Sequence, residues 1–187
     1  GKDVWFYPGW EALPGQGGSS NLDLAGDRLQ TLLNCPDPKE ASSFIMVTDI
    51  QAMMQRTASP KDLQQAAVTI TAGTESDIDQ LAEQLASNGF EFTYEVLNKG
   101  EATKRGGILD VWPIDAPFPI RIEFFGEEIE SIRQFDPLSQ RSVEKMDRIV
   151  IGPATESFGR GLDADLFDYL PPQTGWCWYE PEQIEEH

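Results

Sequence analysis

The sequence has few basic side chains, two cysteines and one histidine. Only 14 lysines and arginines stand against 32 aspartates and glutamates, which gives a formal net charge of −18. Proteins bind duplex nucleic acid by neutralising its phosphates with Lys and Arg, so this excess of acid argues against nucleic-acid binding as the main activity. The histidine, His187, is the last residue, which leaves little for a zinc site or a Ser-His-Asp triad.

Long apolar runs are also absent. No stretch approaches the ~20 apolar residues that span a bilayer, and the N-terminus "GKDVWFYPGW" lacks the layout of a signal peptide. We therefore expect no membrane association. Two cysteines, Cys35 and Cys177, are typical of a chain from a reducing cytoplasm, with a single disulfide as the alternative. Because a strand pattern begins almost at Gly1, we expect a piece of a longer protein.

The sequence lacks a phosphate-binding loop as well. Such a loop requires the pattern Gly-x-x-x-x-Gly-Lys-[Ser/Thr], and "GQGGSSN" (15–21) has no lysine. The stretch "DADLFD" (163–168) lacks the glycine and the distal glutamate of a calcium loop, and acidic residues in the first turn of a helix explain it better. We predict no cofactor, no metal and no catalysis in this chain. An independent acidic hydrolase with paired carboxylates is the least favoured alternative.

The first half of the sequence alternates between strand and helix patterns. Continuous apolar stretches predict buried strands at 4–7, 43–49 and 66–73. Apolar residues at helical spacing predict helices over 22–33, over 50–55, and from a cap at Thr74 or Ser76 to Gly89. This alternation indicates an α/β region with a mainly parallel sheet covered by helices.

The pattern changes after Phe90. Strands without helices are predicted at 90–97, 102–112, 119–125, 127–135 and 143–152. Residues 93–155 also carry 8 of the 14 basic residues, so their surface differs from the acidic remainder. The α/β pattern then returns, with a short helix at 163–170 and a strand at 175–180. The sequence therefore predicts an α/β fold with an inserted antiparallel β module.

One predicted hairpin has an unusual outer face. In "RIEFFGEEIESIRQ" (121–134), a tight turn at Gly126-Glu127 joins two strands, and Phe125 alternates to the polar face with Arg121 and Glu123. One interpretation is that Phe125 covers a small satellite core and that the arginines pair with Glu123, Asp110 or Glu128. The other is an interface, because arginine and large aromatic side chains dominate interface energetics. Arg105, before Gly106-Gly107, would approach Arg121 if their strands are neighbours, and a close backbone approach is expected at the glycines.

Several stretches resemble a known family. "KRGGILDVWP" (104–113), "PIRIEFFGEEIESIRQFDPLSQRS" (119–142) and "RIVIGPA" (148–154) resemble the middle module of bacterial transcription-repair coupling factors and, more distantly, the excinuclease component UvrB. "YPGWEALPG", "VTDIQAMMQR" and "LFDYLPPQTGWCWYEPEQIEE" resemble the segments that flank this module in the coupling factors. The resemblance covers nearly the whole chain.

This resemblance implies both a fold and a function. Residues 1–92 and 156–187 would be parts of a degenerate, incomplete RecA-like lobe of the P-loop NTPase type, and 93–155 would be the inserted module. In the family this module binds the excinuclease component UvrA and recruits it for nucleotide excision repair. The family's contact residues correspond to Arg105, Arg121 and Phe125. DNA and RNA polymerase would bind only to other domains of a parent protein that is an ATP-dependent DNA translocase.

The departures favour the coupling factors over UvrB. The phosphate-binding loop of UvrB is missing, Tyr179 stands where its magnesium-positioning aspartate would be, and "WEALPGQGGSSN" (10–21) does not resemble its tyrosine-rich DNA hairpin. A UvrB-like fragment that also contacts DNA is nevertheless the alternative. Because Lys104 directly precedes Arg105, the sequence does not decide which of these two basic residues lies on the partner-binding surface. If Arg121 and Phe125 are exposed, their replacement by alanine should leave folding nearly intact.

Overall fold

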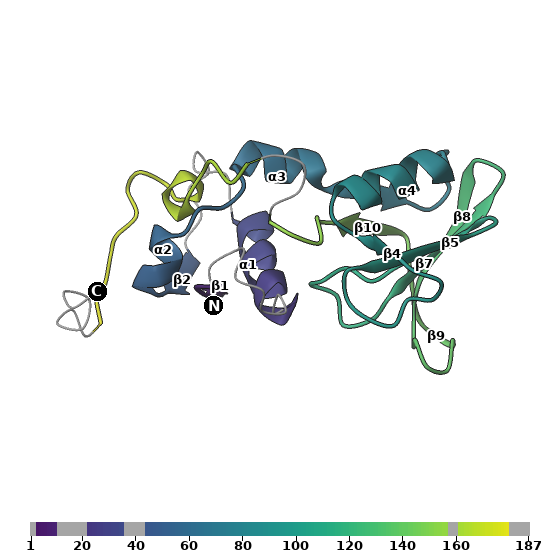
Figure 1. Ribbon diagram of the computed structural model, residues 1–187, viewed down its shortest axis with the longest axis horizontal. Helices are drawn as coiled ribbons and strands as arrows, with labels where there is room; N and C mark the ends of the chain where they lie inside the picture. Colours follow the sequence, from purple (N-terminus) through teal and green to yellow (C-terminus); the bar gives the residue numbers. More distant parts are fainter. Residues whose placement is uncertain (1–2, 11–21, 36–43, 157–160, 180–187) are drawn as a thin grey trace.

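A computed structural model describes residues 3–10, 22–35, 44–156 and 161–179, and Figure 1 shows their arrangement. The strands are β1 (Asp3–Tyr7), β2 (Phe44–Thr48), β3 (Val68–Thr71), β4 (Glu91–Phe92), β5 (Glu101–Arg105), β6 (Ile108–Val111), β7 (Ile120–Phe125), β8 (Glu128–Phe135), β9 (Ser142–Met146) and β10 (Arg148–Ile151). The helices are α1 (Leu22–Asn34), α2 (Ile50–Met54), α3 (Pro60–Ala66), α4 (Ile78–Ser87) and the 3₁₀ helix η1 (Leu166–Tyr169). The protein is mixed α/β with antiparallel pairing, and no helix in these ranges is long and apolar enough to cross a membrane.

The N-terminal elements follow the sequence patterns. β1 and β2 pair in parallel, and α1 packs beside β1, where the Thr31 hydroxyl donates a hydrogen bond to the Phe6 carbonyl oxygen at 2.7 Å. The predicted helix at 22–33, the strands at 4–7 and 43–49 and the short helix at 50–55 are confirmed within the described residues. The expected glycine- and serine-rich loop at 14–21 lies outside them.

Two details of the helices differ from the sequence analysis. α3 was not expected, although Ser59 caps it by accepting a hydrogen bond from the Asp62 amide at 3.1 Å and Pro60 occupies its first turn. α4 is capped by Asp77, whose side chain accepts from the Asp79 amide at 2.8 Å, and not by Thr74 or Ser76. The predicted cap was wrong because the Thr74 hydroxyl donates instead to the Thr71 carbonyl.

The expected mainly parallel sheet is found for β1 and β2 but is wrong for the third strand. β3 pairs antiparallel with β10, from Val68 opposite Ile151 to Thr71 opposite Arg148, and not with β1 or β2. The pairing continues past the end of β3, where the Ala72 amide donates to the Asp147 carbonyl at 2.9 Å. An apolar run predicts a buried strand but does not specify its neighbour.

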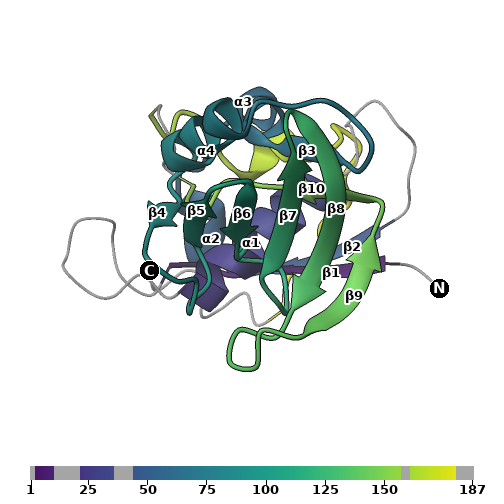
Figure 2. The same cartoon turned by 90° about the vertical axis from the view of Figure 1, so that its right-hand side faces the viewer.

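A six-stranded sheet is the largest sheet among the described residues. Its order is β4-β5-β6-β7-β8-β9, antiparallel except for the short parallel pair of β4 with β5, and Figure 2 shows β5 to β9 side by side. The predicted strand at 90–97 is reduced to Glu91–Phe92. The inner face contributes side chains that are fully buried: Leu109, Val111, Ile120, Ile122 and Ile132. They share one hydrophobic core with Leu81 and Leu85 of α4.

A buried arginine joins α1 to the segment that follows β10. Arg28 of α1 is 0 % exposed and forms an ion pair with Glu156, which follows β10. The same guanidinium donates to the Pro8 carbonyl at 2.6 Å and to the Tyr7 hydroxyl at 2.5 Å. Its carbon lies 4.2 Å from the centre of the Tyr7 ring. A buried charge is tolerated only when paired and hydrogen-bonded, so these contacts fix α1 against β1 and the segment after β10.

The segment after residue 160 is less regular than the sequence suggests. Asp165 and Asp168 form a capping box around η1, which agrees with the expected role of these acidic residues. The strand expected from residue 175 is absent over 175–179. The Trp176 and Trp178 rings stack there with centroids 6.1 Å apart, and Trp176 contacts the Phe167 ring at 5.5 Å. Side chains that alternate in sequence therefore meet on one side of an irregular segment.

The two cysteines are free, so the alternative of a disulfide between them is wrong. Cys35 is half-buried and its thiol donates to the Tyr169 carbonyl at 3.3 Å, whereas Cys177 is exposed. Burial raises the pKa of the Cys35 thiol to about 11, and the thiolate is the reactive form. At about pH 8 we expect one thiol per chain to react rapidly with Ellman's reagent and the second only after unfolding. The Cys177→Ser variant should lose the rapid phase, and two rapid thiols in the wild type would contradict the assignment.

Candidate partner-binding surface

The outer face of the six-stranded sheet displays Phe125 at the end of β7. Along this strand Ile120 and Ile122 are fully buried, while Phe125 is 79 % exposed. The predicted alternation is confirmed, because successive side chains of a strand point to opposite faces. Phe125 therefore does not cover a satellite core, and that part of the first interpretation is wrong.

The hairpin that carries Phe125 is held at both ends. Phe125 pairs with Glu128 across the turn, and Gly126 takes the positive φ of 66° that a tight two-residue turn requires. Backbone hydrogen bonds also join the hairpin to the turn before α4: Ser76 amide to Glu127 carbonyl at 2.7 Å, Ile129 amide to Thr74 carbonyl at 2.9 Å, and Gly73 amide to Ile129 carbonyl at 2.8 Å. A side chain on a fixed backbone loses less conformational freedom when a partner binds it.

Arg121 lies on the same face and is held by a buried carboxylate. Its Nε and Nη2 atoms each donate to one oxygen of Asp110 at 2.7 Å, and Nη2 also donates to Gln140 Oε1 at 2.9 Å. The guanidinium lies over the Phe135 ring, 4.5 Å from its centre. The hydrogen bonds to Asp110 raise the pKa of Arg121 further above its usual value. The Arg121 side chain is only 14 % exposed, so the expectation of a freely exposed arginine is wrong.

Arg105 reaches the same carboxylate from the other side. β6 separates β5 from β7, so Arg105 and Arg121 do not face each other directly, and both point to Asp110. Arg105 Nη2 is 3.7 Å from Asp110 Oδ2, and its side chain is 47 % exposed. Its guanidinium carbon is 5.9 Å from the centre of the Tyr94 ring. Asp110, itself 1 % exposed, therefore brings two of the three predicted residues together.

Lys104 and Gly107 lie close to Arg105 in the chain and bear on two further expectations from the sequence. Lys104 forms an ion pair with Asp79 of α4, on the inner side of the sheet, so Arg105 is the residue that belongs to the outer face. Gly107 makes the close backbone approach expected from the sequence, because a Cβ there would lie 2.8 Å from the Phe124 carbonyl oxygen. Any larger residue at position 107 would push β6 away from β7.

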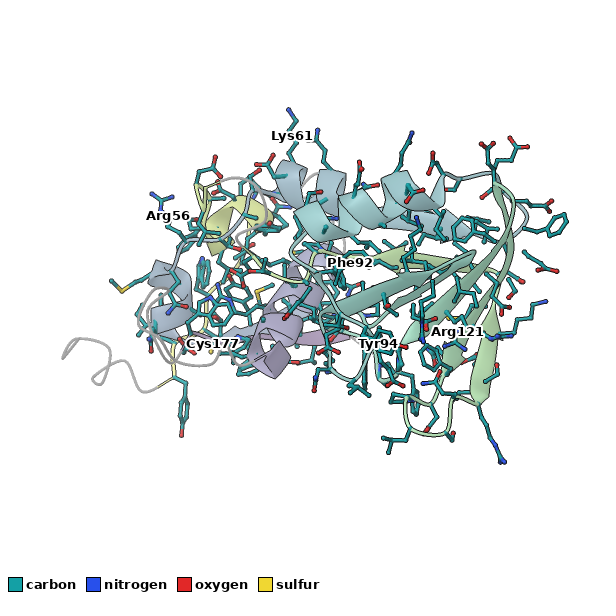
Figure 3. The ribbon with its side chains drawn as sticks, turned by 45° about the vertical axis from the view of Figure 1, so that its right-hand side comes forward. Arg56, Lys61, Phe92, Tyr94, Arg121 and Cys177 are labelled. Carbon is teal, nitrogen blue, oxygen red and sulfur yellow. The ribbon has the colours of Figure 1, made fainter. Side chains whose placement is uncertain are left out.

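Sequence reasoning missed two contributors to this face. Tyr94 is 87 % exposed beside Arg105, but the stretch around it reads as a strand and not as a loop. Arg133 of β8 donates to Glu123 of β7 at 2.6 Å, so one of the predicted arginine–Glu123 pairs exists but with a different arginine. Only the register of the sheet, in which Glu123 lies opposite Ser131, brings these side chains together. Figure 3 shows Tyr94 and Arg121 on the sheet side of the molecule.

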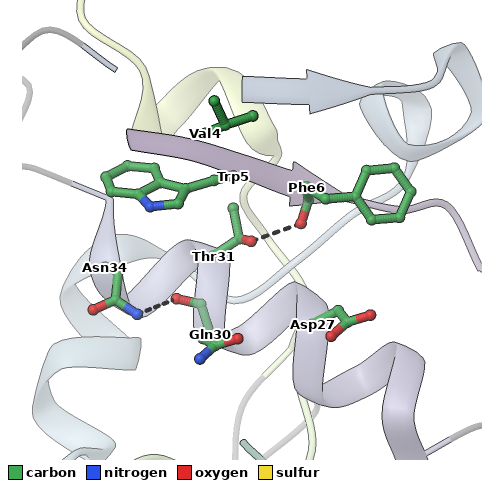
Figure 4. Close-up of a pocket in the computed structure, with 7 residues that line it drawn as sticks. All are labelled: Val4, Trp5, Phe6, Asp27, Gln30, Thr31 and Asn34. Atoms are coloured by element: carbon green, nitrogen blue, oxygen red, sulfur yellow. Dashed lines mark hydrogen bonds between the residues drawn. The ribbon is translucent and has the colours of Figure 1, made fainter. Parts of the chain in front are cut away.

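A groove between β1 and α1 offers little of the chemistry that a hydrolase needs. Figure 4 shows its lining: Val4, Trp5, Phe6, Asp27, Gln30, Thr31 and Asn34. Asp27 is the one carboxylate among these residues, and the Thr31 hydroxyl and Asn34 amide donate to backbone carbonyls. The hydrolase alternative specified a pair of carboxylates as acid and base, so this groove does not favour it. No group of three or more potential metal ligands is found within the described ranges.

The outer face, in contrast, is suited to binding a protein. It combines two large exposed aromatic side chains, Phe125 and Tyr94, with guanidinium groups that lie against a buried carboxylate. Residues 68–157 match the family model described as the UvrB interaction domain. This stretch of the chain is similar to the UvrB interaction domain. The match begins at Val68, so it includes β3 and α4 as well as the six-stranded sheet.

The chain is also similar to transcription-repair-coupling factors and to UvrABC system protein B. The chain is 34 % identical over 155 residues to a transcription-repair-coupling factor from Haemophilus influenzae and 33 % identical over 147 residues to one from Escherichia coli. These alignments cover 83 % and 79 % of the chain, but only 13 % and 12 % of the relatives. It is also 36 % identical over 112 residues to UvrABC system protein B from Thermosipho africanus, covering 60 % of the chain and 17 % of that protein. The resemblance read from the motifs is thus confirmed.

Proposed function

We propose that the outer face of the six-stranded sheet binds UvrA through Arg105, Arg121 and Phe125. The observation that carries the proposal is the exposure of Phe125 on a hairpin anchored by its backbone. Interface hot spots are enriched in aromatic residues and arginine, and the aromatic fills a pocket on the partner. Arg105, which is 47 % exposed, would bind a carboxylate beside that pocket, since a guanidinium forms forked hydrogen bonds to carboxylates. Arg121 would add a weaker contact, because Asp110 already accepts from its Nε and Nη2 atoms.

In the parent protein this contact would recruit UvrA to nucleotide excision repair. We assign no catalysis to the chain itself, and ATP-driven translocation on DNA and binding to RNA polymerase would belong to other domains. The parallel pair β1–β2 with α1 beside it supports residues 1–92 and 156–187 as parts of a degenerate RecA-like lobe. The Arg28–Glu156 ion pair joins these two segments. Residues 93–155 would then be the module inserted between them.

The second candidate function is DNA contact by a UvrB-like fragment. The similarity to UvrABC system protein B favours it, whereas the net charge of −18 opposes it. DNA binding that weakens steeply with added salt would support this candidate, because such binding releases counterions from the phosphates.

Isothermal titration calorimetry of the chain with purified UvrA tests the main proposal. We expect saturable binding, and an unchanged result after nuclease treatment, because the contact is between proteins. The Arg105→Ala variant should bind more weakly while remaining folded, since Arg105 is half-exposed and Asp110 keeps both hydrogen bonds from Arg121. A titration without heat above the dilution background, with both proteins folded, would contradict the proposal.

A further inference from the structure

Four charged side chains form a row across the outer face of the sheet. The strand registers place Asp110 opposite Arg121, Arg121 opposite Arg133, and Arg133 opposite Lys145. Directly paired residues of antiparallel strands lie on the same face, with Cβ atoms about 5 Å apart. The row therefore continues the predicted surface beyond Arg121 by two strands, to β9 at the edge of the sheet.

Like charges opposite each other destabilise a sheet, and this row contains three cations in succession. Two are neutralised from neighbouring positions: Arg121 by Asp110 and Arg133 by Glu123. Lys145 is exposed and forms no ion pair with any residue that the structure describes. Although the protein has 32 acidic residues, none of those in the described ranges forms an ion pair with this lysine at the open end of the cationic row.

The far part of the row borders a shallow open groove. Its lining comes from β7, β8 and β9 and consists of Glu123, Glu130, Ser131, Arg133, Ser142 and Lys145. All six side chains are charged or hydroxylated, so this part of the face would meet a polar surface and not an apolar one. Phe125, at the hairpin end of the same face, would supply the apolar contact.

We infer that Arg133 and Lys145 extend the partner-binding surface and that the partner presents carboxylates along this row. The inference rests on the proposed function, because it concerns the same face and the same partner. Lys145 lies at the rim, where a charge acts mainly on the rate of association and on its salt dependence. In the free protein Arg133 forms an ion pair with Glu123, so a carboxylate of the partner would compete with Glu123 for this guanidinium.

Stopped-flow association with UvrA, measured from low to physiological salt, tests the role of Lys145. At low salt we expect Lys145→Glu to slow association about tenfold and to leave dissociation within about twofold. The matched control is Lys61→Glu, which makes the same charge change on α3, where Lys61 points away from the sheet (Figure 3). It should associate at nearly the wild-type rate. A second variant, Glu123→Gln, removes the carboxylate that occupies Arg133 and should speed association about threefold.

The outcomes separate this inference from the proposed function. Equal association rates for Lys145→Glu and Lys61→Glu, with binding lost in Phe125→Ala, would overturn the inference and leave the UvrA proposal standing. Slower association by Lys145→Glu that disappears at high salt would support it, because screening acts on exposed charges. Absence of UvrA binding by the folded wild type would overturn both.

Discussion

Replacing Phe125 by alanine should weaken UvrA binding by roughly 2 kcal/mol or more, the size typical of an interface hot spot, which is about a thirtyfold rise in Kd. Phe125 is 79 % exposed, so the free protein gains little from its ring. Its removal should therefore leave the free energy of unfolding nearly unchanged, as expected for a substitution at an exposed site. Calorimetry with UvrA and urea unfolding of the same preparation measure the two quantities.

Met54 provides a matched control for this substitution. It is also 79 % exposed, but it lies on α2, away from the six-stranded sheet in Figure 1. Met54→Ala removes an equally exposed apolar side chain and should bind UvrA as the wild type does. Equal affinities for Phe125→Ala, Met54→Ala and the wild type would show that the aromatic side chain is not the anchor.

Replacing Arg121 by alanine should destabilise the fold as well as weaken binding. The substitution removes both hydrogen bonds from the Arg121 guanidinium to Asp110, which is 1 % exposed. Breaking a buried ion pair from one side costs about 3–5 kcal/mol. We expect the lower end of this range, because Arg105 stays 3.7 Å from the stranded carboxylate. The midpoint of urea unfolding should therefore fall clearly below that of the wild type.

The double variant Asp110→Ala/Arg121→Ala separates the cost of the stranded carboxylate from the value of the pair. Without a buried charge to compensate, it should be more stable than Arg121→Ala alone. If Arg121→Ala has the same urea midpoint as the wild type, burial of the Asp110 carboxylate does not depend on its ion pair with Arg121. Because Arg121→Ala should lose stability, its binding to UvrA is measured without denaturant and after its folding has been checked. Phe125→Ala should keep its stability, so a change in its affinity reports on the partner contact alone.

Local sequence patterns were sufficient to predict the display of Phe125. The alternation of Ile120, Ile122 and Phe124 with the outward residues defines the two faces of β7 without knowledge of its neighbours. The glycine in "FFGEE" specifies the position of the turn. These features depend on contacts within about ten residues, and the structure confirms both.

The partner of Arg121 could be predicted from the sequence only as one of three carboxylates, Glu123, Asp110 or Glu128, and the structure selects Asp110. Asp110 precedes Arg121 by 11 positions on another strand, and only the β6–β7 register places the two opposite each other. Likewise, an apolar stretch at 68–71 predicts a buried strand, but its pairing with β10 depends on the path of nearly eighty intervening residues. Trp176 and Trp178 follow a strand pattern yet stack on each other in an irregular segment.

Amide hydrogen exchange of the chain, with and without UvrA, tests the location of the interface most directly. It requires no substitution and reports local protection along the backbone. We predict slower exchange in the complex at the turns beside the proposed contacts, residues 105–108 and 125–128, and unchanged exchange over α2 and α3, residues 50–66. Slower exchange confined to 50–66 or to the β1–α1 groove, with the two turns unchanged, would show that UvrA binds a different face of the protein.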